Sequence, residues 1–370
     1  RFRGAILGLM RLKRLSVFGE RWHCKRQQPQ TPIGRKKEAM SAELTFTTAM
    51  TLSDNSVYMA GAGDALDTFA HFTRVVRYDG DYDPQWGRND QDWRAVSLTY
   101  FGPEKEREFD DVVILSEEGH VRYIGDHDPL LEKIPGAGVY SKDAKGWGYL
   151  ADIQQIGEHM YACGYKGQVY KRLGAGDWRH VDAGLLQDPK TPQEQRIALS
   201  VINGPHENAI YAAGYQHAEW LPPKAFFFNG QQWFELKLPE VAERIVNMYV
   251  ESDERIWMCG SNGTLLLGNA RDGFKSLSTV DDNQLFTSIC KFQDKMYLAS
   301  NLGLFIYDPN DHEAGIQKVV TDLHPDLQDA NIVDSYDKVL WSIGPKDIAR
   351  FDGKKWERIH HPDNPRIGEE

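Results

Sequence analysis

The sequence predicts an all-β protein, a seven-bladed β-propeller built from four-stranded antiparallel blades. One short pattern, an aromatic-rich strand that ends near a glycine, recurs along the chain, and its copies begin 40 to 55 residues apart. That period is typical of propeller blades rather than of helical repeats. Strands do not alternate with helical segments, which argues against a parallel-sheet fold. The seven copies begin at Val57, Val112, Met160, Ile210, Ile256, Met296 and Val339.

The first and last repeats each divide into four strands. We expect the first repeat at residues 44–52, 56–61, 72–78 and 92–98, with Trp93 opening its fourth strand. We expect the last repeat at residues 331–335, 339–343, 348–351 and 356–360. In both repeats an aromatic residue followed by Asp-Gly ends the third strand, and a Trp opens the fourth. Asp-Gly tolerates positive φ, so it favours a tight hairpin at this place.

The middle repeats follow the same order of strands. Their first strands are expected at residues 149–156, 197–202, 246–251 and 286–292. A glycine after the second strand (Gly61, Gly164, Gly214, Gly260) predicts a bend or a close approach of neighbouring backbone. A meander with two apolar faces needs neighbours on both sides, and radial stacking leaves only short edges. Because the first and last repeats each look complete, we expect the ring to close by packing rather than by sharing a strand.

Charge divides the chain into a basic leader and an acidic body. Residues 1–39 carry a net charge of +9, and the remainder carries −20. Met40, followed by two small residues, looks like a natural start, so we expect a disordered leader at 1–41, one propeller at 42–361 and a polar tail at 362–370. The alternative for the leader is a basic segment that contacts membrane or nucleic acid. An acidic body repels nucleic acid and favours basic protein partners.

Cysteine usage and hydropathy favour a cytoplasmic protein. Four cysteines are too few for a disulfide scaffold, and three of them fall inside predicted strands. We therefore expect Cys163, Cys259 and Cys290 to be buried free thiols. No apolar run approaches the ~18 residues that span a bilayer, so no membrane contact is expected from the body. We expect a monomer.

These repeats resemble the WD40/YVTN/BNR-like group of bacterial propellers over residues 42–361. The segment 288–309, SICKFQDKMYLASNLGLFIYDP, is similar to the blades of regulator-type sensor propellers. The chain departs from two informative subfamilies, since it has neither the Asp-rich turn of sialidase-type repeats nor the Trp-Asp ending of WD40 blades. Members without catalytic motifs include assembly factors and immunity proteins encoded beside secreted toxins. The resemblance therefore implies a protein-binding role of one of these kinds.

Long loops on one end of the ring are the predicted partner-binding site. Two of these loops connect second to third strands (63–71 and 215–224). The other three are predicted to connect one repeat to the next (100–111, 139–148 and 184–196). Aromatic anchors beside carboxylates suit a basic protein surface and speed its association. The predicted binding residues are Trp147, Tyr165, Tyr215, His217, Trp220, Glu104, Glu106, Glu108 and Asp110.

Catalytic motifs are not found in the sequence. It has no nucleophile elbow, no phosphate-binding glycine loop, and no pair of histidines at the spacing of a helical metal site. We therefore predict no catalytic residue, no metal site and no cofactor.

Three functions stay open. The first is a binder of a basic protein, for example an immunity protein that neutralises a toxin such as a nuclease. The second is an assembly or scaffold factor. The third is a lyase or hydrolase on sugars, with carboxylates at the channel mouth. Paired carboxylates with raised pKa values in a cleft would favour the enzyme.

Overall fold

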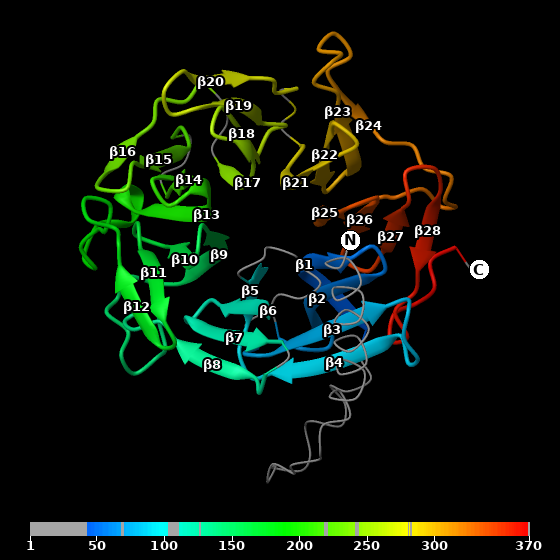
Figure 1. Cartoon of the computed structure of the whole chain (residues 1–370), viewed down its shortest axis with the longest axis horizontal. Coiled ribbons are helices and arrows are strands. Elements are labelled where there is room, and N and C mark those ends of the chain that lie inside the picture. The colour runs from blue at the N-terminus through cyan, green and yellow to red at the C-terminus, as the bar shows by residue number, and fades with distance from the viewer. Residues whose placement is uncertain are drawn as a thin grey trace, which may run out of the picture.

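The computed structural model describes residues 43–67, 70–102, 111–125, 127–217, 221–240, 244–279, 281 and 283–368. Within them, seven antiparallel sheets of four strands stand as blades around a central axis (Figure 1). Each blade uses four consecutive strands, and the first strand of each lies nearest the axis. Among the described residues the helical element is the short 3-10 turn η2 (Gln193–Gln195). The predicted fold of seven four-stranded blades is confirmed.

The strands of the first four blades have the following bounds. Blade 1 contains β1 (Leu44–Ser53), β2 (Ser56–Gly63), β3 (Thr73–Asp79) and β4 (Trp86–Gln91). Blade 2 contains β5 (Ala95–Phe101), β6 (Asp111–Ser116), β7 (His120–Ile124) and β8 (Leu130–Lys133). Blade 3 contains β9 (Leu150–Ile156), β10 (His159–Gly164), β11 (Val169–Gly174) and β12 (Asp177–His180). Blade 4 contains β13 (Ile197–His206), β14 (Ala209–Gln216), β15 (Lys224–Phe228) and β16 (Trp233–Glu235).

The remaining three blades complete the ring. Blade 5 contains β17 (Ile245–Ser252), β18 (Arg255–Gly260), β19 (Leu265–Asn269) and β20 (Gly273–Ser276). Blade 6 contains β21 (Phe286–Phe292), β22 (Lys295–Ser300), β23 (Gly303–Tyr307) and β24 (Ile316–Lys318). Blade 7 contains β25 (Ile332–Tyr336), β26 (Val339–Ile343), β27 (Ile348–Phe351) and β28 (Trp356–Ile359).

One strand assignment in the first repeat was wrong. The segment 92–98, expected as the fourth strand of blade 1, instead leads into β5, the first strand of blade 2. The fourth strand is β4, and its opening Trp86 pairs with Tyr78 across the hairpin. The rule that a Trp follows the aromatic-Asp-Gly turn therefore holds, but for Trp86. Trp93 is a buried residue packed between blades 1 and 2.

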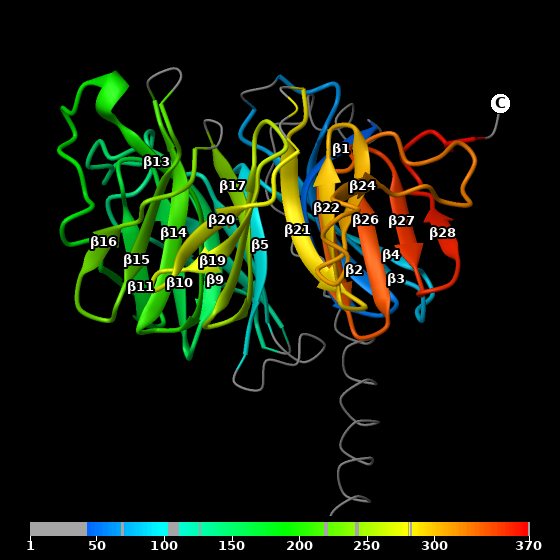
Figure 2. The ribbon, with the colours of Figure 1, turned by 90° about the horizontal axis from the view of Figure 1, so that it is seen from above.

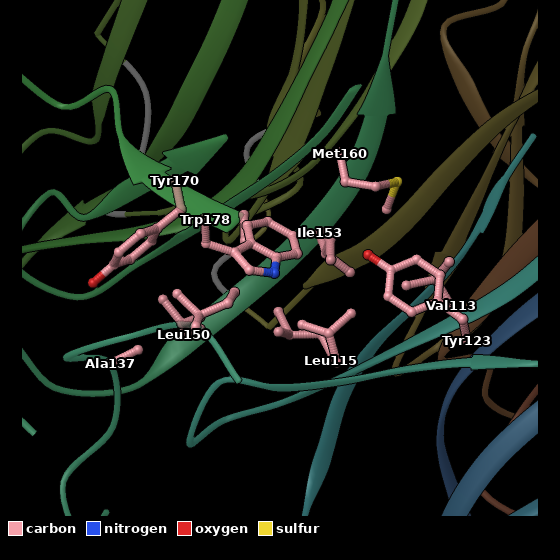
Figure 3. Packing of buried hydrophobic residues seen from close by; sticks show 12 residues of the cluster. Val113, Leu115, Tyr123, Ala137, Leu150, Ile153, Met160, Tyr170 and Trp178 are labelled. Atoms are coloured by element: carbon pink, nitrogen blue, oxygen red, sulfur yellow. The ribbon is translucent and has the colours of Figure 1, made fainter. Parts of the chain in front are cut away.

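The hydrophobic core of the described residues is divided among the spaces between blades. Seven clusters of buried side chains each join two consecutive blades, including blades 7 and 1. Figure 3 shows the cluster between blades 2 and 3, where Leu115 and Tyr123 face Ile153 and Trp178. Because every blade buries both faces against neighbours, no blade is expected to be stable alone.

The recurrent glycine after the second strand has the predicted cause. A Cβ at Gly214 would lie 1.9 Å from the carbonyl oxygen of Ala198, and one at Gly260 would lie 1.8 Å from that of Arg244. In blades 1, 3, 4 and 5 the first strand therefore approaches too closely for a side chain at this position.

The cysteine prediction is also confirmed. Cys163, Cys259 and Cys290 are buried free thiols. Burial raises the pKa of the Cys163 and Cys259 thiols, which keeps them protonated.

The ring closes by packing, as predicted, and the C-terminal segment adds a clamp. Asp334 of blade 7 accepts a hydrogen bond from the backbone N–H of Thr51 in blade 1 (2.9 Å). Beyond β28, the buried Asn364 side chain accepts from the N–H of Leu44 (2.7 Å) and donates to its carbonyl oxygen (3.0 Å). His361 packs its ring edge-on against Phe46 of β1. The segment after the last strand therefore belongs to the folded ring at least as far as Asn364.

Candidate functional site

The two ends of the ring are formed by different kinds of chain segment. One end, here called the loop face, carries the turns between second and third strands and the connections from blade to blade. The other end, the hairpin face, carries the turns between first and second strands and between third and fourth strands. Figure 2 shows the ring from the side, with the loop face at the top. The long connections at 134–149 and 181–196 both lie on the loop face.

Three of the predicted binding residues meet on the loop face. Tyr165 follows the second strand of blade 3, Tyr215 lies near the end of the second strand of blade 4, and their hydroxyl oxygens are hydrogen-bonded at 3.1 Å. The ring of His217 lies 5.4 Å from that of Tyr165 and 5.3 Å from that of Tyr215, centroid to centroid. Both tyrosines also line the mouth of the central channel. The structure therefore brings together three predicted binding residues, two of which are 50 positions apart in the sequence.

Two arginines lie beside this cluster. The guanidinium carbon of Arg244 lies 4.5 Å from the centroid of the Tyr215 ring, a cation–π contact. The N–H of His217 donates to the carbonyl oxygen of Arg196 (2.9 Å). Burial lowers the pKa of His217, and the charges of Arg196 and Arg244 lower it further, so its imidazole is neutral at pH 7. Burial also raises the pKa of Tyr215, so its phenol keeps its proton.

Lys166, next to Tyr165, ties two long loops together. It adopts a left-handed backbone conformation (φ 55°), and its side chain is buried. Its Nζ donates to the carbonyl oxygens of Gly146 and Pro189, each at 2.6 Å. Burial lowers the pKa of this ammonium group. Lys166 therefore fixes the connections on either side of blade 3 against the tyrosine cluster.

Trp147 lies on the same face but makes different contacts. Its ring is half-buried and packs edge-on against His180 at 5.0 Å. His180 in turn is hydrogen-bonded to the carboxylate of Asp182 (2.8 Å). Trp147 is thus partly committed to packing in blade 3, which leaves a smaller area free for a partner.

Five of the predicted binding residues fall outside the described residues: Trp220, Glu104, Glu106, Glu108 and Asp110. Residues 100–111 were expected to connect two repeats, but Phe101 and Asp111 pair with each other across β5 and β6. The stretch between them therefore joins the first and second strands of blade 2, and its assignment as a connection between repeats was wrong. The error follows from misplacing the fourth strand of blade 1.

The hairpin face carries acidic residues close to the channel axis. In every blade except blade 2, part of whose turn is outside the described residues, the turn between first and second strands contains a carboxylate. Some are paired, since Glu207 bonds to Lys171 and Asp294 to Lys291. The loop face also carries carboxylates, among them Glu118, Asp143 and Asp182, so acidic residues occur at both ends of the ring. The carboxylates in the turns of the hairpin face are Asp54, Glu158, Glu207, Asp253, Glu254, Asp294 and Asp337.

The central channel has a volume of about 740 Å³ and is lined mainly by first strands. The carboxylates that line it accept hydrogen bonds from neighbouring blades. Asp152 accepts hydrogen bonds from Ser97 Oγ of blade 2 (2.8 Å) and from the N–H of Ile202 in blade 4 (3.0 Å). Burial raises the pKa of Asp152. Among the described residues no group of three His, Cys, Asp or Glu side chains is placed to hold a metal ion.

Sequence reasoning missed Tyr140, the most exposed aromatic side chain of this face among the described residues. Tyr140, in the connection between blades 2 and 3, is 71% exposed, and Val139 beside it is 47% exposed. Glu118 accepts hydrogen bonds from the backbone around them. The run Gly-Ala-Gly before Val139 was the available signal in the sequence, because closely spaced glycines mark a turn.

Solved structures with the same architecture identify the fold. The chain is similar to the WD40 β-propeller domain of Doa1, with a TM-score of 0.56 and 9% identity over 84% of this chain and 92% of that one. It is also similar to YCF48 bound to a D1 peptide, with a TM-score of 0.56 and 13% identity over 86% and 93% of the two chains. By fold, this chain is a seven-bladed β-propeller. At these identities the likeness concerns the fold alone. No family model matches the sequence.

One curated relative of this propeller carries functional information. The immune protein Tsi7 of Pseudomonas aeruginosa is 28% identical over 268 residues, which is 72% of this chain and 80% of that protein. An immune protein is named for protection rather than for catalysis, in agreement with the expectation of a non-enzymatic protein. In the described residues, no helix is long and apolar enough to cross a membrane.

Proposed function

We propose that this propeller is an immunity protein, which binds a toxin protein stoichiometrically and neutralises it. The observation that carries the proposal is its similarity to an immune protein over most of both chains. The geometry of the loop face supports a protein-binding role, because it offers aromatic anchors held in place by buried polar contacts. Such pre-organised anchors lose little conformational entropy on binding.

The loop face is the proposed binding surface. Nine large hydrophobic side chains are exposed among the described residues, and five of them lie on this end. The other four lie on third or outer strands of blades. Apolar side chains gathered on one end support a protein interface there. The five are Val139, Tyr140, Leu221, Leu302 and Val320.

We further propose that the toxin is a basic protein. The chain from residue 40 onward carries a net charge of −20. Such a field attracts a cationic protein from a distance and raises its association rate. The cluster of Tyr165, Tyr215 and Arg244 would then make short-range contacts, together with Trp220 in the same loop as His217.

Growth protection tests the proposal. The product of the gene next to this one in the native genome would be expressed in a bacterial host with and without the propeller. We expect growth arrest without it, rescue with it, and a 1:1 complex by size-exclusion chromatography with light scattering. A neighbouring product that is harmless alone, or a toxin that the propeller neither binds nor neutralises, would refute the assignment.

A second candidate, an assembly or scaffold factor, makes a different prediction. It would bind a harmless partner, so co-purification without any toxicity would favour it.

A further inference from the structure

A small apolar projection stands on the loop face between blades 2 and 3. Its tip is the pair Val139 and Tyr140, here called the Val-Tyr knob. Tyr140 is 71% exposed and Val139 is 47% exposed, although both belong to a chain segment with extensive internal hydrogen bonding. The exposed area of Tyr140 does not stabilise the propeller, because the core between blades 2 and 3 is formed by other side chains.

A buried carboxylate builds the knob. Glu118, in the turn between β6 and β7, is only 6% exposed. Its carboxylate accepts hydrogen bonds from three consecutive backbone N–H groups, those of Val139 (3.1 Å), Tyr140 (3.0 Å) and Ser141 (3.1 Å). A carboxylate that accepts several N–H bonds fixes the backbone strongly, because each bond is charge-assisted. The knob is therefore pre-organised.

The rest of the loop is equally constrained. Gly138 has φ +94°, and a Cβ there would lie 2.3 Å from the Glu118 carboxylate, so only glycine fits. The N–H of Gly136 donates to Asp143 (2.8 Å), and Lys133 Nζ donates to the carbonyl oxygens of Ile134 (2.8 Å) and Ala137 (3.1 Å).

Two contacts orient the Tyr140 ring without covering it. His71 of blade 1 packs edge-on against it at 5.7 Å. Burial, and a hydrogen bond with the Tyr140 hydroxyl, raise the pKa of Tyr149 to about 12. These two contacts therefore fix the orientation of the Tyr140 side chain and leave its other side exposed.

Charged side chains flank the knob. Lys142 and Lys145 are exposed in the same loop, and so is Asp143, whose carboxylate accepts a hydrogen bond from the Gly136 N–H (2.8 Å) and lies 3.9 Å from Lys133. The exposed lysines of this loop therefore outnumber its exposed aspartate. A surface complementary to this loop is apolar at its base and acidic at its rim.

We propose that the Val-Tyr knob inserts into a cleft of the toxin that has an apolar floor and carboxylates at its edge. This inference rests on the proposed function and specifies its contact. A toxin that is basic overall can carry such a cleft, because hydrolases that cleave phosphodiesters hold their metal ions with carboxylates. Filling that cleft with Tyr140, flanked by two lysines, would block the entry of substrate.

Titration of the purified neighbouring-gene product against variants tests the proposal. Tyr140→Ala should weaken binding at least about 30-fold, the loss typical of an interface hot spot, with the unfolding midpoint unchanged. Tyr140→Phe should bind within about threefold of the wild type, because the ring is the anchor. Leu131→Ala is the matched control, since Leu131 is 53% exposed on an outer strand, and it should bind normally.

Charge and pre-organisation are tested separately. Reversing both lysines (Lys142→Glu with Lys145→Glu) should slow association, and an acceleration would overturn the acidic rim. The N–H groups of residues 139–141 should exchange slowly with deuterium in the wild type and rapidly in Glu118→Gln. Rapid exchange in the wild type would overturn the pre-organised knob.

The outcomes separate the two proposals. If the wild type does not bind the probe, the proposed function falls and the knob's role falls with it. If the wild type binds and Tyr140→Ala binds equally well, the proposed function stands and the inference about the knob is wrong.

Discussion

Replacing Asn364 with Ala should weaken the closure of the ring. The Asn364 side chain is buried (8% exposed) and forms two hydrogen bonds with the backbone of Leu44, at 2.7 and 3.0 Å. Leu44 is itself 1% exposed, so its N–H and carbonyl oxygen lose a partner that water replaces poorly. A buried polar group left unsatisfied costs about 1–3 kcal/mol. With part of that recovered by relaxation, we expect a loss of about 2 kcal/mol.

Equilibrium urea unfolding, followed by tryptophan fluorescence, measures this loss. Asn208→Ala, in an exposed turn between β13 and β14, is the control and should leave the midpoint unchanged. If Asn364→Ala unfolds at the wild-type urea concentration, the C-terminal segment contributes nothing to closure and the clamp is wrong. If only the slope of the unfolding free energy against urea concentration changes, the substitution has altered how cooperatively the ring unfolds.

Three further predictions concern ion pairs and thiols of the ring. Glu132→Ala removes the carboxylate that bonds Arg172 (2.6 Å) and Trp178 (2.8 Å) between blades 2 and 3. It should destabilise by about 3–5 kcal/mol in urea unfolding, and the added Arg172→Met change should recover most of this. Burial raises the pKa of Glu207, but hydrogen bonds from Lys171 and His159 outweigh this and hold it at about 2, against 4.5 when unfolded. Its stabilisation is therefore complete above pH 4.5 and lost as the pH falls towards 2, so Glu207→Gln should flatten the acid unfolding profile in that window. Thiol reagents should label the buried cysteines only after unfolding, and rapid labelling of the native protein would contradict their burial; these are Cys163, Cys259 and Cys290.

Most of the fold could be predicted from the sequence because each blade repeats one local pattern. Aromatic strands, a glycine at the close approach of the first strand, and Asp-Gly before a Trp are short-range signals, and they gave seven blades correctly. The failure was also local. The hairpin after Tyr78 is longer than in the last blade, so the strand that follows was assigned to Trp93 instead of Trp86.

The site was less accessible because it depends on which end of the ring each loop occupies. One misplaced strand turned the stretch between β5 and β6 into a connection between repeats, and its carboxylates were therefore joined to aromatics of the loop face. The structure brings Tyr165, Tyr215 and His217 together, and their places in the repeat are equivalent or adjacent. Tyr140 was missed, because the carboxylate that organises its loop lies some twenty residues away and leaves no local pattern.

Hydrogen–deuterium exchange of the propeller, with and without the purified neighbouring-gene product, tests the central claim most directly. A toxin-binding loop face predicts slower exchange on complex formation at residues 134–149, 165–168, 181–196 and 215–217, with the turns of the hairpin face unchanged. Protection confined to the hairpin turns, or none in a mixture where the toxin is neutralised, would contradict binding through the loop face.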